Sequence, residues 1–219
     1  MASPTLARLH VLTDHRLADG GPSHAEQARW GADGGAGAVQ FRAKDGTDRD
    51  AFAALVATRD ALAGTGVQLI VDDRIDWALA AGADGVHLGQ TDLPIAAARR
   101  LADSVRPGFL VGATVTTADG ARRAQDEGAD GLGFGPVFPT TSKANPASVK
   151  GLDGLAAACA AVRIPVLAIA GITPERAGPC LDAGAWGVAV MSAVTRAAAP
   201  ADAAAAFAEQ IAAWQRRAG

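Results

Sequence analysis

The stretch GADGVHLGQTDLP, residues 82–94, passes from a glycine turn through a short apolar run to a glycine and an acid. Its first four residues recur as GADG at 31–34 and 128–131, and as GAWG at 184–187. Glycine readily adopts the left-handed conformation that ends many helices. We therefore expect each copy to end a helix and to lead into a strand, so that the chain repeats one helix–strand unit.

The rest of the chain follows the same alternation. Alanine-rich amphipathic segments separate short apolar runs at residues 9–13, 38–42, 67–71, 85–89, 109–114, 131–135, 165–170 and 187–191. The runs are continuously apolar, as expected when helices cover both faces of a parallel sheet. Eight such units predict a single-domain (β/α)₈ TIM barrel over residues 1–219, with a doubly wound open sheet as the alternative.

The composition argues against nucleic-acid and membrane partners. The chain is 49% hydrophobic, and its net charge of −3 comes from interspersed acids and bases. No run approaches the roughly 18 apolar residues that span a bilayer, so we expect a cytoplasmic protein. Cys159 and Cys180 lack metal-ligand spacing, which favours packing roles. The sequence leaves open whether the chain forms a homo-oligomer.

Polar residues follow several of the expected strands, at the barrel face that carries active sites. Asp73 follows the third strand and Asp92 follows the fourth. Two neighbouring carboxylates suit Mg²⁺, which completes its shell with water and phosphate oxygens. Alternatively, each aspartate caps the helix that comes after it.

Basic residues are expected on the same face. Arg42 and Lys44 end the second strand, and an extended backbone would direct both to one side. Lys143 lies in the long loop 138–151, which we expect to act as a lid rather than as a surface loop without a role. Hydroxyl groups that can donate to phosphate open this loop, at Thr140, Thr141 and Ser142. Cations opposite two acids suit a magnesium–diphosphate complex.

The last two strands predict a second anion site. Helix starts follow them in AGITPER (170–176) and VMSAVTR (190–196). Backbone N–H groups at two helix N-termini would converge there, where barrels often bind phosphate. The alternative is ordinary helix initiation at Thr173 and Pro174.

The histidines offer little direct chemistry. His10 and His87 lie inside expected strands, which favours packed, hydrogen-bonded roles over general-base catalysis. Neither a Ser/His/Asp nor a Cys/His pattern is indicated, and the sequence contains no GxGxxG or P-loop motif. The expected catalysis is therefore electrostatic.

Several motifs together resemble the thiamine phosphate synthase family across nearly the whole chain. They include VQFRAK (39–44), VDDRIDWALAAGADGVHLGQTDLP (71–94), GLGFGPVFPTTSK (131–143) and AIAGITPE (168–175). The resemblance implies that a thiazole phosphate displaces pyrophosphate from hydroxymethylpyrimidine diphosphate, through a dissociative step. The resemblance also implies that the substrates are small molecules and that the cofactor is Mg²⁺.

The resemblance also implies roles for individual residues. Asp73 and Asp92 would hold Mg²⁺, and Gln40 would touch the pyrimidine. The groups that would grip the diphosphate are Arg42, Lys44, Lys143 and Thr114. Those that would hold the thiazole phosphate are Thr140 and Ser142, with the backbone N–H groups of Gly171, Met191 and Ser192.

Four positions depart from the family pattern. His10 stands where the family usually has Tyr, Thr114 where it has Ser, and Ala170 where it has Gly. Asp72, at a position expected to bind substrate, replaces a usual Asn. An ionised Asp72 would repel diphosphate unless Mg²⁺ or Lys44 compensates.

Two other functions remain open at this point. A thiazole tautomerase of the same barrel family would keep the thiazole phosphate pocket, but the resemblance to tautomerases calls for a histidine at Thr116. A barrel that binds phosphate without catalysis is the other alternative, because fold alone does not establish an activity.

Overall fold

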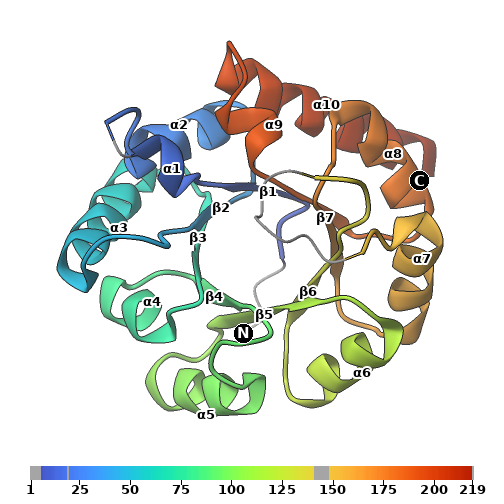
Figure 1. The fold of residues 1–219 in the computed structure, drawn as a ribbon, viewed down its shortest axis with the longest axis horizontal. Coiled ribbons are helices and arrows are strands. Elements are labelled where there is room, and N and C mark those ends of the chain that lie inside the picture. The colour runs from blue at the N-terminus through green and yellow to red at the C-terminus, as the bar shows by residue number, and fades with distance from the viewer. Residues whose placement is uncertain (1–5, 19, 141–147, 219) are drawn as a thin grey trace.

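The computed structural model describes residues 6–18, 20–140 and 148–218. The described residues form eight parallel strands that close into a barrel in the order β1 to β8. The strands surround the centre in Figure 1, and the helices form an outer ring. This arrangement confirms the predicted (β/α)₈ barrel and rules out the open sheet.

The strands are short and the helices vary in length. The strands are β1 Leu9–Leu12, β2 Ala38–Phe41, β3 Gln68–Asp72, β4 Gly85–Leu88, β5 Leu110–Val115, β6 Gly131–Phe134, β7 Val166–Ile169 and β8 Gly187–Val190. The helices are α1 His15–Ala18, α2 His24–Asp33, α3 Asp48–Leu62, α4 Ile75–Ala81, α5 Ile95–Val105, α6 Ala118–Asp126, α7 Gly151–Ala161, α8 Pro174–Asp182, α9 Ser192–Thr195 and α10 Pro200–Ala218.

The repeated glycine turns are confirmed at three places and wrong at one. Gly82, Gly128 and Gly184 have φ angles of 72°, 98° and 97° and stand between a helix and the next strand. Gly31, by contrast, lies inside α2, where an added Cβ would approach Val11 to 3.1 Å. Gly35, with φ of 83°, makes the turn before β2 instead. Close packing of α2 on β1 explains the glycine at position 31.

The hydrophobic core lies mainly between the barrel and its helices. Val11, Val39, Val71 and Val86 alternate with inward-facing residues and are fully buried. The barrel interior includes polar side chains at its centre, among them His10, Gln40 and His87. Barrels are usually filled by branched apolar residues, so polar groups here indicate a role beyond packing.

The segment after β8 forms two helices. It breaks into the one-turn helix α9 and the long helix α10, which begins at Pro200. Proline fits the first turn of a helix and disfavours the helical conformation in the residue before it. No helix in the described parts of the chain is long and apolar enough to cross a membrane.

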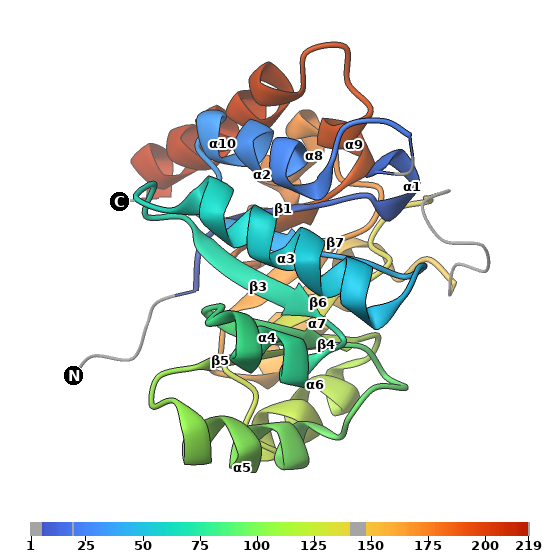
Figure 2. The same ribbon diagram turned by 90° about the vertical axis from the view of Figure 1, so that its left-hand side faces the viewer.

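The barrel closes where β1 pairs with β8. Leu9 lies beside Val188, and the Arg8 Nη1 atom donates a hydrogen bond of 2.6 Å to the Trp186 carbonyl oxygen. The Arg8 guanidinium also stacks 3.8 Å from the centre of the Trp186 ring. The Trp186 indole N–H donates to the Leu6 carbonyl oxygen at 2.8 Å. These contacts join the two ends of the sheet, and Figure 2 shows the backbone of β1 from the side.

Candidate active site

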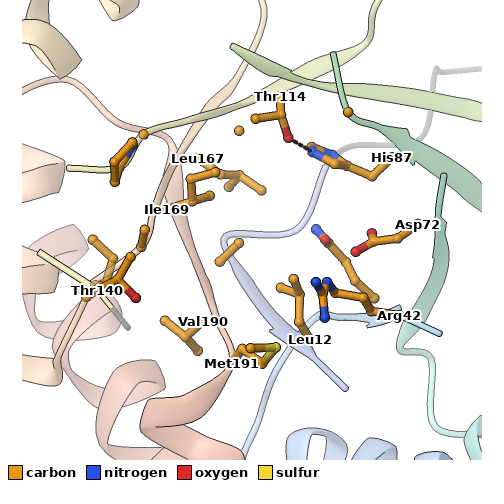
Figure 3. A pocket seen from close by; sticks show the side chains of 18 of the residues that line it. Leu12, Arg42, Asp72, His87, Thr114, Thr140, Leu167, Ile169, Val190 and Met191 are labelled. Carbon is orange, nitrogen blue, oxygen red and sulfur yellow. Dashed lines mark hydrogen bonds between the residues drawn. The ribbon is translucent and has the colours of Figure 1, made fainter. Parts of the chain in front are cut away.

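A cavity of about 450 Å³ opens at the carboxyl ends of the strands. Figure 3 shows its two sides: Arg42, Asp72, His87 and Thr114 come from β2 to β5 or the residues after them, whereas Thr140 and Val190 lie on the other side. Leu167 and Ile169 of β7 also line the cavity. One side is therefore charged and polar, and the other is mainly apolar.

Asp73 and Asp92 meet at the mouth of this cavity, as the strand order predicts. Gly89 N donates a hydrogen bond of 2.6 Å to Asp92 Oδ2, and Lys44 forms an ion pair with Asp73. The helices that follow begin after Arg74 and Pro94, and neither helix receives a side-chain cap. The alternative in which the two aspartates cap these helices is therefore wrong.

The two carboxylates interact electrostatically. Burial raises the pKa of Asp92, the Gly89 N–H lowers it, and the neighbouring Asp73 carboxyl raises it again. Asp73 is also held at a φ of 69°, unusual for a residue with a side chain. Two acids held together without a full set of counter-charges fit a divalent cation that takes only one or two protein carboxylates. Within the described residues, no cluster of three or more His, Cys, Asp or Glu side chains could hold a metal alone.

Arg42 presents a donor to the charged side. Its backbone N–H donates to Thr13 Oγ1 at 3.0 Å, and the same hydroxyl oxygen lies 2.7 Å from His24 Nδ1. This network fixes the backbone at the end of β2. The Arg42 Nη1 atom is buried and has no hydrogen-bond partner among the described residues. A buried guanidinium nitrogen in this state fits an anionic ligand.

The two histidines are packed and hydrogen-bonded, as predicted. His10 Nδ1 lies 2.9 Å from Gln40 Nε2, and His87 Nε2 lies 2.8 Å from Thr114 Oγ1 (Figure 3). Burial and the nearby His87 lower the pKa of His10 to about 3. His87 also lines the cavity, which its position inside a strand did not indicate.

The apolar side brings together the residues expected to hold the second phosphate. Thr140, Gly171, Met191 and Ser192 all line the cavity. Arg176 Nη1 donates to the Gly171 carbonyl oxygen at 2.7 Å. The helix after β8 has a single turn, so the expected pair of helix dipoles reduces to one helix of ordinary length, α8.

The expected lid lies only partly within the structure. Residues 141–147, including Thr141, Ser142 and Lys143, are outside the described residues. Thr140 marks the edge of the described part and lines the cavity. The roles of Ser142 and Lys143 therefore stay predictions.

One buried acid at this face was not anticipated. Asp14 follows β1 and is fully buried, with hydrogen bonds from Arg16 Nε at 3.0 Å and from Arg196 Nη2 at 3.1 Å. It thereby ties the end of β1 to the residue after α9. The strand-end rule that selected Asp73 and Asp92 would also have found Asp14, since it stands two residues beyond β1.

The fold and the charged mouth are typical of (β/α)₈ barrels that act on phosphorylated small molecules. Residues 9–194 match the sequence model described as thiamine monophosphate synthase. The chain belongs to this family.

Individual relatives are similar to this chain over most of their lengths. A thiamine-phosphate synthase of Salinibacter ruber is 48% identical over 206 residues, which cover 94% of this chain and 89% of the relative. One of Methanoculleus marisnigri is 44% identical over 85% of this chain and 86% of its own. The solved structure of a thiamine phosphate pyrophosphorylase from Pyrococcus furiosus superimposes with a TM-score of 0.84 at 37% identity, covering 94% of this chain and 96% of that one.

Proposed function

We propose that the protein is a thiamine-phosphate synthase. It joins hydroxymethylpyrimidine diphosphate to a hydroxyethylthiazole phosphate, and it releases pyrophosphate. The carbon–oxygen bond to the diphosphate breaks, and the thiazole nitrogen supplies the electron pair for the new carbon–nitrogen bond. The named relatives and the family match support the overall reaction.

The observation that carries the proposal is the meeting of Asp73 and Asp92 beside Lys44 at one mouth. A leaving diphosphate needs cations that stabilise its growing negative charge more in the transition state than in the substrate. A catalyst for thiazole isomerisation has no such need. The charged side therefore supports a diphosphate substrate.

The carboxylates of Asp73 and Asp92 are the groups that would hold Mg²⁺. When bound, this ion neutralises charge on the departing diphosphate. Arg42 and Lys44 add fixed positive charge on the same side of the cavity. Each phosphate carries on the order of −1.5 to −2 charges at neutral pH, so these cations offset part of the negative charge that the diphosphate and the aspartates bring together.

The other residues of the cavity bind and orient. Gln40 lies at the base of the charged side, where we place the pyrimidine ring. Thr114 and Asp72 are placed near the diphosphate, and Thr140, Gly171, Met191 and Ser192 near the thiazole phosphate. The apolar walls from Leu167 and Ile169 exclude water from a reactive pyrimidine cation. Charged substrates of this kind do not cross membranes unaided, so we place the reaction in the cytoplasm.

A pyrophosphate-release assay tests the proposal directly. We expect release only when Mg²⁺ and both substrates are present, with thiamine phosphate as the second product by chromatography. Isomerisation of the thiazole phosphate without metal would identify a tautomerase instead. Binding of either substrate without turnover would identify a non-catalytic barrel.

The residue at position 116 argues against the tautomerase. Thr116 lines the cavity where the resemblance to tautomerases calls for a histidine. A threonine hydroxyl is a poor general base at neutral pH. No described contact favours isomerisation over coupling.

A further inference from the structure

A hydrogen-bonded chain runs from the backbone of Ala7 through His10 to Gln40 at the floor of the cavity. We propose that His10 is a positioning residue that fixes the orientation of the Gln40 amide, so that the site selects an aminopyrimidine over an oxopyrimidine. This inference deepens the proposed function and rests on it for the identity of the ligand. The proton positions follow from two contacts, and the position of Gln40 in the cavity gives the consequence.

The first contact decides which nitrogen of His10 carries hydrogen. His10 is 1% exposed, and its Nε2 atom lies 3.2 Å from the Ala7 carbonyl oxygen. A carbonyl oxygen can only accept, so Nε2 must donate. The ring is neutral at physiological pH, because burial and His87 lower the pKa of His10 to about 3. In a neutral ring, the other nitrogen, Nδ1, is then an acceptor.

The second contact fixes the orientation of the Gln40 amide. Nδ1 of His10 lies 2.9 Å from the Gln40 amide. Because Nδ1 can only accept, the amide must turn its NH₂ group to the histidine. The flipped amide would set its oxygen against Nδ1, two acceptors at hydrogen-bond distance. The backbone oxygen of Ala7 therefore fixes the amide through the ring.

The third step concerns the cavity. Gln40 is 3% exposed but lines the cavity, so its amide can meet a ligand only in the orientation that His10 allows. Its oxygen accepts a hydrogen bond, and its second N–H donates one. An aminopyrimidine edge, an amine beside an unprotonated ring nitrogen, matches this pair. With its exocyclic group held on the same side as the amine, an oxopyrimidine edge, a carbonyl beside a ring N–H, reverses donor and acceptor, and only a flipped amide matches it.

Two isosteric variants separate this role from simple packing. In His10→Asn, the side-chain oxygen lies close to the position of Nδ1 and preserves an acceptor for Gln40. In His10→Gln, the amide lies close to the position of Nε2 and the acceptor beside Gln40 is lost. Both remove the ring, so a purely structural role predicts similar effects from both. Urea unfolding identifies any loss of folding.

The binding experiment uses isothermal titration calorimetry. It compares the dissociation constant of hydroxymethylpyrimidine diphosphate, which carries an amino group, with that of its 4-oxo analogue. We expect the wild type and His10→Asn to prefer the amino compound about 10- to 100-fold, as mismatched polar edges predict. In His10→Gln, the preference should fall to within about threefold. Equal preference in all three proteins, or no binding of either pyrimidine, would overturn the inference.

A second measurement depends on no ligand. Nitrogen-15 spectra of the free wild type should show His10 protonated at Nε2 and not at Nδ1. Protonation at Nδ1 refutes the inference. Pyrophosphate release by the wild type is measured separately and tests the proposed function. If the wild type releases pyrophosphate but His10→Gln keeps the wild-type pyrimidine preference, only this inference is refuted. Selective binding with no release defeats the proposed synthase alone.

Discussion

Ala170 offers a test of backbone strain on the apolar side of the cavity, which it lines. It has a φ of 70°, held by hydrogen bonds from Val137 N to Ile169 O at 3.0 Å and from Phe138 N to Ala170 O at 3.2 Å. The left-handed conformation costs a residue with a Cβ about 1–2 kcal/mol. Glycine avoids that cost, but the greater conformational entropy of its unfolded chain lowers stability by about 0.4–1 kcal/mol. We expect Ala170→Gly to raise the free energy of unfolding by about 0.5 kcal/mol.

The sign of the change is diagnostic, because Ala→Gly elsewhere in regular structure lowers stability by roughly 0.5–1 kcal/mol. Urea unfolding followed by tryptophan fluorescence measures it, with an unchanged slope against urea as the check on two-state behaviour. The matched control is Gly171→Ala. Its added Cβ would lie 2.5 Å from the Pro139 carbonyl oxygen at a φ of 69°, and we expect a loss of at least about 2 kcal/mol. A destabilised Ala170→Gly variant would refute the strain argument.

Three further substitutions test the charges around the cavity. Asp92→Asn should lower kcat/KM at least about 100-fold and raise the Mg²⁺ concentration needed for half-maximal rate, with unchanged unfolding; steady-state kinetics across a Mg²⁺ series measures both. Asp72→Asn should keep or raise kcat/KM in the same assay, since it removes a charge that repels diphosphate; a large loss contradicts this. Burial raises the pKa of Asp14, but hydrogen bonds from Arg16 and Arg196 outweigh burial and lower the pKa from 3.8 to about 2. The ionised form thus adds about 2 kcal/mol of stability, fully present above pH 3.8 and lost as the pH falls towards 2. The difference in urea midpoint between the wild type and Asp14→Asn should shrink from pH 7 to pH 3, and a constant difference would contradict it.

The repeat pattern predicted the barrel because the same physical constraint acts at each turn. A helix must end and the chain must reverse before the next strand, and glycine does both at Gly82, Gly128 and Gly184. The pattern failed at Gly31 because a glycine is also needed wherever a helix approaches a strand closely. Because Gly34 and Gly35 follow closely, the spacing does not show which glycine makes the turn and which allows the helix to pack closely on the strand.

The site was predictable where strand order alone decides position. Asp73 and Asp92 follow adjacent strands, so their meeting required only the topology. The ion pair of Lys44 with Asp73 depends on where two side chains reach, which no spacing encodes. The hydrogen bond between Gln40 and His10 likewise joins residues 30 positions apart, through a ring placed by barrel packing. Such contacts follow from three-dimensional packing rather than from a local pattern.

The seam between β1 and β8 bears on how the protein is made. The hydrogen bond from Arg8 to Trp186 spans 178 positions. During synthesis, β1 therefore cannot pair with β8 until nearly the whole chain has been made. Until then, β1 has an unpaired edge that is open to association with other chains. Loop-closure entropy makes this last pairing slow relative to local helix formation. We therefore expect newly made chains to be most prone to aggregation just before the ring closes.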